Sequence, residues 1–570
     1  MKITIAKTAG FCMGVRRAVD MVLTASNNRK EPICTYGPLI HNPQVLAMLE
    51  EKGIPCINVI PEHGEGTILI RAHGVPPQDE YALEQAGFHI INATCPRVIR
   101  VQRIIKKYAQ KGYAAIIIGD KDHPEVKGLL GYAPERGYTA STIEEFKKLP
   151  QFEKAVVVAQ TTQNTATYNQ IKNCAENDLP HYQIFDTICD STEKRQAEVR
   201  NIAEQNDAIV VIGGKKSGNT QRLAQIAIET GKPTFHIEDI LELDFKKLAG
   251  AESVAITAGA STPNWIINKT CRTIEESIQR KKLFSSSVFF QIRKFLLKSN
   301  LLLSLGAGCL TYASSMLQGL DHNMTHALIA MLYILSMQII NNIFTIKSDK
   351  YNNPERAQFY QKHNILLTFI AGVSGAAGLY MALSLNLFSF FVLMVMSILG
   401  LSYNQKIIPE FISKSKKRRI KDIPGSKTIL IAAAWGIVTS ILPAISDPGG
   451  VSFLPASIFA AGLVFARTAF FDILEIQGDK IAGKETLPIL IGEKKSIKLI
   501  KLILVSLSLL LVFTAGMGIV DKCGFPIALV PILMLYYIHR NEKGDIRSGA
   551  RLEFIVESHF IIAGVLAAIG

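Results

Sequence analysis

The stretch Ile184-Phe-Asp-Thr-Ile-Cys189-Asp-Ser-Thr-Glu-Lys-Arg195 places a cysteine between a strand-like run and a helix-like run. Two other stretches have the same arrangement, Ile3-Thr-Ile-Ala-Lys-Thr-Ala-Gly-Phe-Cys12-Met-Gly-Val-Arg-Arg17 and Ile90-Ile-Asn-Ala-Thr-Cys95-Pro-Arg-Val98. The three cysteines are 83 and 94 residues apart. This spacing predicts three α/β units, each with one thiol at the carboxyl end of a strand, where open α/β sheets bind ligands.

Three thiolates on a pseudo-threefold axis would suit an iron–sulfur cluster that leaves one iron free. The spacing alone is a weak signal, because the chain has no Cys-x-x-Cys pair and single cysteines are usually small buried hydrophobic residues. Nine cysteines in 570 residues are also too few for a disulfide scaffold. We interpret the cysteines outside the repeat as structural: Cys34, Cys56, Cys174, Cys271, Cys309 and Cys523.

Residues 1–280 have the pattern of a soluble α/β protein. Amphipathic segments with charged faces, such as Val98–Lys111 and Thr192–Gln205, alternate with short β-branched runs. This alternation predicts parallel sheets that are covered by helices on both faces. The runs expected to form strands are Lys2–Ala6, Thr67–Ile70, Ala114–Ile118, Ala155–Val158, Ala208–Ile212 and Val254–Thr257.

The composition changes abruptly at Leu301, and charged residues become rare. Over the whole chain hydrophobic residues make up 48% and charged residues only 19%, with a mean hydropathy of +0.22. About 20 apolar residues span a bilayer, so we expect an all-α domain of membrane spans. Buried core helices, the alternative, would carry a polar stripe on the outer face, and these segments do not. The nine expected spans are 300–320, 326–346, 364–384, 387–403, 428–446, 453–471, 499–520, 524–539 and 554–570.

Lys and Arg crowd the segments before the first expected span and after the second, fourth, sixth and eighth, most densely in Lys414–Lys421. The opposite connections, Asp321–Thr325, Asp447–Gly450 and Asp521–Gly524, contain Lys522 as their only cation. This alternation is the positive-inside pattern, and it predicts an N-terminal half in the cytoplasm and a C-terminus outside. The net charge of +14 therefore indicates membrane topology and anionic lipid, with no nucleic-acid partner.

These patterns divide the chain into an α/β domain over 1–280, an interfacial linker over 281–299 and a transmembrane domain over 300–570. The expected location is the inner (cytoplasmic) membrane, with several passes through the lipid bilayer. The first residues, Met1–Lys7, include no apolar signal core, so we expect no secretion signal.

Polar loops follow several of the expected strands in residues 1–280. Gly-flanked loops such as Gly213–Thr220 and Thr257–Thr262 can cradle phosphate with their backbone N–H groups. A single loop of this kind is more often an ordinary turn, but several of them after strands indicate one shared anionic site. The residues singled out in these loops are His41, His73, His123, Glu125, Thr161, Thr162, Ser217, Gly218, Asn219 and Ser261.

At these residues the half 1–280 resembles the LytB/IspH family, the 4-hydroxy-3-methylbut-2-enyl diphosphate reductases of the non-mevalonate isoprenoid pathway. The family's motifs stand in its order: Gly-Phe-Cys12-x-Gly-Val, His41-Asn, Ala-His73-Gly-Val, Ala-Thr-Cys95-Pro, His123-Pro-Glu125-Val, Gln-Thr161-Thr162, Thr-Ile-Cys189 with Arg195-Gln196, Ser217-x-Asn219 and Gly-Ala-Ser261. One departure is Gly218, where many relatives have a second Ser, so that backbone would replace one hydroxyl contact.

The resemblance implies a three-lobed, pseudo-threefold fold around one 4Fe–4S cluster held by Cys12, Cys95 and Cys189, with the fourth iron on the substrate's hydroxyl oxygen. It implies Glu125 as the proton donor and Thr161 or Thr162 near that hydroxyl. The diphosphate of the substrate would contact His41, His73, His123, Ser217, Gly218, Asn219 and Ser261. The reaction would remove an allylic hydroxyl with two protons and two electrons from a donor such as ferredoxin or flavodoxin, giving isopentenyl and dimethylallyl diphosphates.

Two polar stretches stand at the cytoplasmic ends of spans, Asn341–Asp349 (the first) and Asp472–Pro488 (the second). Together with Arg418–Gly425 they resemble the UbiA superfamily of intramembrane prenyltransferases over about residues 285–570. In the second stretch three acidic residues recur at helical spacing and share one face, where carboxylates can hold Mg²⁺ on a diphosphate. In the first stretch the family's acids are replaced by Asn342 and Thr345, so the Mg²⁺ affinity should fall. The candidate ligands of Mg²⁺ or diphosphate are Asn342, Asp349, Asp472, Glu475 and Asp479.

We therefore expect a fusion of a soluble reductase with a membrane domain that resembles a prenyltransferase. The alternative is a membrane-anchored scaffold, or a prenyltransferase, whose reductase half only binds a cluster. A scaffold would need neither Glu125 nor the diphosphate loops. In the membrane half, solvated helix ends or an inactive transferase remain alternatives to a metal site.

Overall fold

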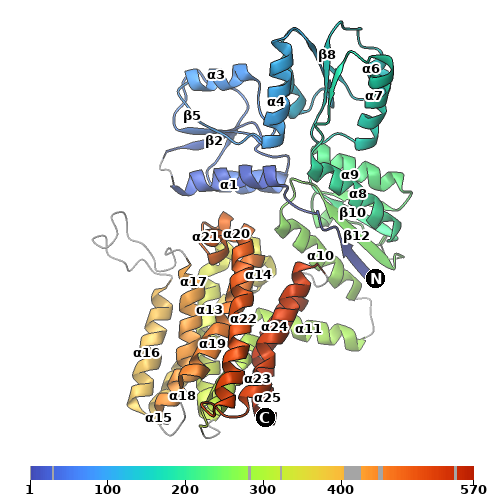
Figure 1. Cartoon of the computed structure of the whole chain (residues 1–570). Coiled ribbons are helices and arrows are strands. Elements are labelled where there is room, and N and C mark those ends of the chain that lie inside the picture. The colour runs from blue at the N-terminus through green and yellow to red at the C-terminus, as the bar shows by residue number, and fades with distance from the viewer. Residues whose placement is uncertain are drawn as a thin grey trace. The chain divides into compact units, whose positions relative to one another are not determined.

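The structure is a computed structural model that describes residues 2–28, 31–248, 250–279, 284–320, 324–403, 425–446, 453–544 and 549–570. The chain divides into two compact units, Met1–Lys281 (unit 1) and Lys282–Gly570 (unit 2). Each unit has its own architecture, α/β in the first and all-helical in the second (Figure 1).

Unit 1 contains three four-stranded sheets in which all paired strands run parallel, which confirms the three α/β units expected from the cysteine repeat. Parallel strands need crossover connections, and helices between successive strands supply them. The strand orders are β1 (Lys2–Ile5), β12 (Ser253–Ala258), β10 (Ala208–Ile212), β11 (Thr234–Ile237); β3 (Cys56–Ile57), β2 (Ile33–Tyr36), β4 (Thr67–Ile70), β5 (His89–Asn92); and β7 (Gly137–Ala140), β6 (Ala114–Ile118), β8 (Ala155–Ala159), β9 (Gln183–Phe185).

The three sheets share one connectivity, although the first is assembled from both ends of unit 1. In the second and third sheets the chain begins at an inner strand, β2 or β6, adds one strand on each side, and ends at the edge strand β5 or β9. The first sheet repeats this order with β10, β11 and β12, and its edge strand is β1 from the N-terminus. Each cysteine of the repeat therefore follows an equivalent edge strand.

All six runs predicted to form strands do so. The inner strands β4, β6, β8 and β10 are buried over their whole length, as expected for parallel strands between helical layers. Six further strands were not predicted, and some, such as β5 and β9, are edge strands whose exposed polar residues weaken the apolar pattern.

Helices fill the connections of unit 1, and the two predicted helices match α4 and α8 within two residues. The helices are α1 (Met13–Asn28), α2 (Pro43–Glu51), α3 (Pro77–Gln85), α4 (Pro96–Ala109), α5 (Pro124–Leu130), α6 (Ile143–Lys147), α7 (Thr165–Asp178), α8 (Asp190–Glu204), α9 (Gly218–Glu229), the 3-10 helix η1 (Ile240–Glu242) and α10 (Asn264–Gln279).

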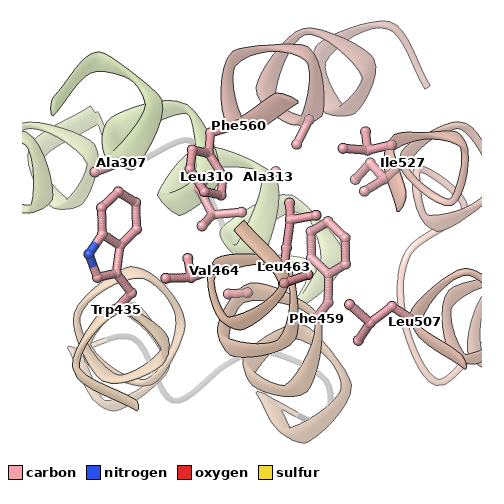
Figure 2. Packing of buried hydrophobic residues seen from close by; sticks show 14 of the residues in the cluster. Ala307, Leu310, Ala313, Trp435, Phe459, Leu463, Val464, Leu507, Ile527 and Phe560 are labelled. Atoms are coloured by element: carbon pink, nitrogen blue, oxygen red, sulfur yellow. The ribbon is translucent and has the colours of Figure 1, made fainter. Parts of the chain in front are cut away.

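Unit 2 is a bundle of apolar helices around a buried core (Figure 1). Figure 2 shows side chains of this core, among them Leu310, Trp435, Leu463 and Phe560, with the Trp435 and Phe560 rings 5.3 Å apart between centroids. The elements are α11 (Phe284–Lys298), α12 (Leu301–Leu317), α13 (Met324–Asn352), α14 (Pro354–Lys362), α15 (Asn364–Leu385), α16 (Leu387–Ser402), α17 (Ser426–Gly436), the π-helix η3 (Ile437–Ile441), α18 (Leu442–Ser446), α19 (Phe453–Leu474), α20 (Ile476–Ile481), α21 (Leu487–Ile491), α22 (Glu493–Gly516), α23 (Gly524–Ile527), α24 (Leu529–Glu542) and α25 (Ala550–Ile569).

Small residues allow α12 and α25 to approach closely. A Cβ on Gly306 would lie 3.0 Å from Cβ of Phe560, and one on Gly564 would lie 2.9 Å from the carbonyl oxygen of Cys309. Side chains at these two positions would force the helices apart, so glycine sets their spacing, as is typical of helix contacts in membranes.

Among the residues that the structure describes, six helical segments are long and apolar enough to cross a membrane, and the pair Val288–Lys298 and Leu301–Leu317, bent by 73°, could form a seventh. Unit 2 is thus a multi-pass membrane domain. The expected span 387–403 is the 16-residue α16, and 524–539 is divided between α23 and α24. Nine spans therefore stay a prediction. The basic run Lys414–Lys421, the motif Arg418–Gly425 up to Pro424, the connection Asp447–Gly450 and residues 321–323 lie outside the described residues.

Candidate active site

The three repeated cysteines occupy equivalent places, each at the N-terminus of a helix that follows an edge strand. Cys95 and Cys189 are the N-cap residues of α4 and α8, and Cys12 directly precedes α1. Their backbone N–H groups donate to carbonyl oxygens of neighbouring loops: Cys12 to Ala260 at 3.1 Å, Cys95 to Ala72 at 2.9 Å and Cys189 to Thr161 at 3.0 Å. A helix N-terminus stabilises a thiolate, the form of cysteine that ligates metals.

The fold brings the three thiols into one region. Burial raises the pKa of Cys95, backbone N–H groups of Arg97 and Val98 oppose the rise, and the thiols of Cys12 and Cys189 are close enough to add to it. Gly14 lies against Cys95, since a Cβ there would be 2.5 Å from its Sγ. A side chain at position 14 would therefore displace the sulfur.

The arrangement of these thiols suits a multi-iron cluster better than a single ion. Three thiolates on one zinc ion, at about 2.3 Å each, would lie within about 4.6 Å of one another. Among the described residues, the group whose ligand atoms all lie within 4.8 Å of one another consists of three histidines and not of these cysteines. Sulfurs that share a region at larger separation, each at a helix N-terminus, fit a cluster.

Three histidine side chains meet in a second group next to this region. The ring centroids of His41 and His73 are 4.7 Å apart, those of His73 and His123 are 5.4 Å apart, and those of His41 and His123 are 5.7 Å apart. Nε2 of His41 and Nδ1 of His73 are buried without a hydrogen-bond partner. Burial lowers the pKa of all three, to about 4 for His123, with Arg71 adding to the effect. These rings are neutral near pH 7, and those of His41 and His73 each have a free nitrogen for a ligand.

Hydroxyl and amide groups surround the histidines. Ser217 is the N-cap of α9, and its Oγ accepts a bond from Ser261 Oγ at 3.4 Å. Ser261 Oγ lies 3.2 Å from the carbonyl oxygen of His41, and Nδ2 of Asn219 is buried without a partner. A Cβ on Gly218 would lie 3.3 Å from His123 Nε2, so this glycine lines the same site. The chain thus collects all seven residues expected to contact a diphosphate.

Glu125 is a buried carboxyl group, 1% exposed, at the start of α5. Thr161 donates to it twice, from the backbone N–H to Oε1 at 2.7 Å and from Oγ1 to Oε2 at 3.0 Å. Burial raises the pKa of Glu125 to about 7, and the two bonds from Thr161 oppose the rise. A carboxyl with this pKa can hold a proton near neutral pH and release it to a substrate.

The two threonines that the sequence left as alternatives differ in the structure. Thr161 contacts Glu125, whereas Thr162 accepts a bond from Gln160 Nε2 at 3.0 Å. Thr161 also connects Glu125 to the cysteine region, because Cys189 N and Thr192 Oγ1 both donate to the Thr161 carbonyl oxygen. The hydroxyl beside the Glu125 carboxyl group is therefore that of Thr161.

Sequence analysis gave no role to Arg195. Its side chain is 4% exposed, and it donates to the carbonyl oxygens of Gly10 at 2.7 Å and Ala258 at 3.2 Å. Burial lowers its pKa, while the nearby Cys12, Glu198 and Cys189 oppose that shift. A buried cation beside two of the three thiols would offset the negative charge of a cluster bound there. The sequence feature that could have indicated this role is the position of the Arg, six residues after the repeated Cys189.

In unit 2 the acidic residues of the two polar stretches gather at the ends of α13 and α19 and in α20. Asp472, fully buried, accepts from Lys427 Nζ at 2.6 Å on Oδ1 and from Thr428 Oγ1 at 2.8 Å on Oδ2. Burial raises the pKa of Glu475. The nearby Asp479 and Asp349 raise this pKa further, and Lys427 lowers it. Acids from both stretches thus share one cluster with Lys427.

Cations and neutral groups also meet the other acids of this cluster. Lys484 Nζ is 3.4 Å from Asp479 Oδ1 and 3.7 Å from Asp349 Oδ1. Thr345 Oγ1 donates to Asp349 Oδ2 at 2.8 Å, and Asn352 Nδ2 donates to Asp479 Oδ1 at 2.9 Å. Asp479 Oδ2 is buried without a partner.

Asn342, the remaining candidate of the first stretch, has a different neighbour. It lies near Tyr360 on α14, whose hydroxyl accepts from Asn300 Nδ2 at 2.6 Å, while Nδ2 of Asn342 is buried without a hydrogen-bond partner. Its amide is therefore part of the contact between α13 and α14.

Comparison with known proteins separates the same two halves. Residues 3–275 match the LytB protein family and residues 301–556 match the UbiA prenyltransferase family. Over 283 residues the chain is 40% identical to 4-hydroxy-3-methylbut-2-enyl diphosphate reductase of Geobacter sulfurreducens, covering 50% of this chain and 100% of that protein.

Solved structures resemble each half. The E-1-hydroxy-2-methyl-but-2-enyl-4-diphosphate reductase of Plasmodium falciparum is 28% identical with a TM-score of 0.46, covering 48% of this chain and 87% of that chain. A UbiA homologue from Archaeoglobus fulgidus bound to GPP and Mg²⁺ is 17% identical with a TM-score of 0.37, covering 48% of this chain and 97% of that chain. By the family match over residues 3–275 and the 40% identity, the chain belongs to the LytB family of 4-hydroxy-3-methylbut-2-enyl diphosphate reductases, fused in this protein to a UbiA prenyltransferase-family domain over residues 301–556.

Proposed function

We propose that unit 1 reduces 4-hydroxy-3-methylbut-2-enyl diphosphate to isopentenyl and dimethylallyl diphosphates. The observation that carries the proposal is the buried Glu125–Thr161 pair between the three-histidine group and the region of the three thiols. A scaffold that only binds a cluster would have no use for a protonated carboxyl group hydrogen-bonded to a threonine.

Cys12, Cys95 and Cys189 would hold a 4Fe–4S cluster, which supplies electrons and an open iron that acts as a Lewis acid when it is bound. Two electrons from an external donor, such as ferredoxin or flavodoxin, and two protons enter the reaction. The allylic C–O bond breaks and the hydroxyl takes up one proton and leaves as water. The second proton adds to the reduced allyl group at either of its two end carbons, which gives the two products. Glu125 supplies a proton to the hydroxyl oxygen through its contact with Thr161, and after each turnover it takes up a proton again.

The diphosphate would bind where His41, His73, His123, Ser217, Asn219 and Ser261 converge with the backbone at Gly218. Neutral imidazoles with free nitrogens, hydroxyls and a helix N-terminus offer several donors in a site with little water. Binding holds the allylic end of the substrate toward Glu125 and the cysteines.

The test is the anaerobically purified full chain, with iron counted and turnover of 4-hydroxy-3-methylbut-2-enyl diphosphate followed with a reduced donor. Conversion to both five-carbon diphosphates supports the proposal. A chain that holds about four irons and turns over no substrate supports the scaffold alternative.

We propose prenyl transfer from an allylic diphosphate as the function of unit 2. The supporting observation is that acids of both polar stretches lie in one cluster at the ends of α13 and α19. Prenyl transfer by the full chain in liposomes, with an aromatic acceptor and geranyl diphosphate, tests it.

We place the reductase half on the cytoplasmic side of the inner membrane. The positive-inside pattern supports this orientation. The helix α11, which precedes the bundle, exposes Phe289, Ile292 and Phe295, as a helix lying in the membrane interface would.

A further inference from the structure

The acidic cluster of unit 2 contains resident cations. Four acids, Asp349, Asp472, Glu475 and Asp479, lie within electrostatic reach of three cations, Lys427, Lys484 and Arg356. Arg356 is also paired with Glu553. A site built to bind Mg²⁺ would leave its carboxylate oxygens free for the metal.

Both oxygens of Asp472 already accept a hydrogen bond. Lys427 occupies Oδ1 and Thr428 occupies Oδ2, and the carboxylate is fully buried. A divalent cation could reach Asp472 only by displacing Lys427, which would leave a partly buried ammonium group without its partner. In the first stretch, moreover, Asn342 and Thr345 carry no charge. Asp349 and Asp479, one acid from each stretch, already share Lys484 Nζ at 3.7 and 3.4 Å, so this set of residues fits a Mg²⁺ site poorly.

The side chains of the two lysines are more exposed to solvent than the carboxylates they pair with. The side chain of Lys427 is 29% exposed and that of Asp472 is 0% exposed. The side chain of Lys484 is 26% exposed and that of Asp479 is again 0% exposed. The cations therefore form the accessible surface, and the carboxylates support them from behind, which is the reverse of a metal-binding site.

An ammonium group in this position can bind phosphate. Lysine has three N–H donors and is a common phosphate ligand. Asp472 takes one donor of Lys427, so up to two others can reach an oxygen of a diphosphate without breaking the ion pair.

We propose that Lys427, held by Asp472, takes the place of a divalent cation and that unit 2 binds the diphosphate of a prenyl diphosphate without Mg²⁺. This inference rests on the proposed prenyl-transfer function of unit 2. It identifies Lys427 as the residue that contacts the diphosphate and Asp472 as a positioning residue.

The experiment measures equilibrium binding of radiolabelled geranyl diphosphate to the detergent-solubilised full chain, in EDTA and in saturating Mg²⁺. Wild type should retain its affinity in EDTA. Lys427→Met should lower the affinity in EDTA by about tenfold or more, the scale of one charge-assisted hydrogen bond, and Lys427→Arg should retain most of it. Wild type and every variant are measured in a chain that also carries His41→Ala and Ser217→Ala, which remove diphosphate contacts proposed for unit 1, so the binding that remains is that of unit 2.

Two further variants make the comparison specific. Lys501→Met, which breaks a Lys–Glu542 pair of 2.5 Å elsewhere in unit 2, is the matched control and should leave binding unchanged. Lys427→Met alone would leave the buried Asp472 carboxylate without its cation. The double variant Lys427→Met with Asp472→Asn removes that charge, so it should fold and still lack metal-independent binding.

Each adverse result has a distinct meaning. If wild type binds in Mg²⁺ but loses binding in EDTA, the inference is wrong and prenyl transfer by unit 2 stands. If Lys427→Met binds like wild type in EDTA, the lysine has no such role. If no binding depends on unit 2 with or without Mg²⁺, both the inference and the prenyl-transfer function are wrong.

Discussion

At the scale of single residues, the reductase half depends on side chains whose neighbours change their chemistry. Glu125 would be an ordinary ionised carboxylate at the surface, but burial raises its pKa to about 7, and Thr161 fixes both of its oxygens. Cys12, Cys95 and Cys189 would be ordinary thiols, but each stands at a helix N-terminus in a shared region.

The first prediction concerns the cysteines. Cys12→Ser, Cys95→Ser and Cys189→Ser should each abolish the brown colour of the protein and its reductase turnover, because a three-thiolate cluster cannot lose one ligand. Cys34→Ser and Cys56→Ser, outside the shared region, are the controls and should keep both. Absorption spectra and iron counts decide the matter, and a repeated cysteine that proves dispensable would contradict the three-thiolate site.

The second prediction concerns acid catalysis. Glu125→Gln keeps the size of the side chain and loses its transferable proton, so turnover should fall by roughly 10²-fold or more while the iron content stays unchanged. Because the pKa of Glu125 is raised to about 7, the proton is present below that pH, and wild-type turnover should fall as the pH rises through about 7. The Gln variant should lack this decrease in its pH profile. A variant with near-wild-type turnover would remove Glu125 from the mechanism.

The third prediction concerns Arg195. Arg195→Met removes a buried cation beside Cys12 and Cys189, so the reduction potential of the bound cluster should become more negative. The free energy of unfolding should also fall by about 1–3 kcal/mol for each carbonyl oxygen, of Gly10 and Ala258, that loses its donor. A redox titration followed by electron paramagnetic resonance reports the potential. Arg195→Lys, which keeps the charge, should restore most of the potential; equal potentials in wild type and the Met variant would show a structural role only.

At the scale of elements, the membrane site is defined by which helix ends meet. The end of α13 carries Asp349, and α20 carries Asp479, which Asn352 of α13 binds directly. Gly478 permits this approach, since a Cβ there would lie 1.7 Å from Asn352 Oδ1. The two polar stretches are more than 120 residues apart in the chain, and the packing of α13 against α20 joins them.

The fourth prediction belongs to this contact. Asn342→Asp combined with Thr345→Asp adds two carboxylates on α13, one of them directly beside Asp349, where Thr345 now donates a hydrogen bond. Charged oxygen ligands bind Mg²⁺, so the double variant should bind Mn²⁺ or Mg²⁺ more tightly than wild type. Without a metal the added repulsion should lower its melting temperature. Titration with Mn²⁺ detects the gain, and Asn341→Asp serves as a neighbouring control. Unchanged metal affinity would show that this end of α13 takes no part in a metal site.

At the scale of the whole molecule, the chain joins an iron–sulfur reductase to a multi-pass membrane domain, so the side of the membrane on which unit 1 lies decides which electron donor it can meet. Cys56 offers a probe of this side, because it is exposed on unit 1. The fifth prediction is that a membrane-impermeant maleimide labels Cys56 only after the cells are permeabilised. The variant Cys56→Ser assigns the label, and labelling of intact cells would place the reductase half outside.

Several features of the chain could be predicted from local sequence. The buried strands β4, β6, β8 and β10 are continuous apolar runs. Such a run can be identified from the sequence without knowing which strands it pairs with. The membrane half could be predicted in the same way, because helices of a soluble protein would carry a polar outer face, and these long helices are almost uncharged. Edge strands such as β5 and β9 were missed, since half-exposed residues do not form a distinctive pattern.

Other features were decided only by the tertiary structure. Strand β1 completes a sheet whose other strands begin some 200 residues later, and this pairing makes Cys12 equivalent to Cys95 and Cys189. The choice of Thr161 over Thr162 depends on which hydroxyl the fold directs at Glu125. Asp472 looks like a metal ligand in the sequence, but Lys427 lies 45 residues before it, and only the packing of α17 on α19 brings that ammonium onto the carboxylate. Local pattern thus determined the elements and the types of chemistry present, while long-range contacts decided which group each side chain meets, because charge and hydrogen bonding act over a few ångströms in space and not along the chain.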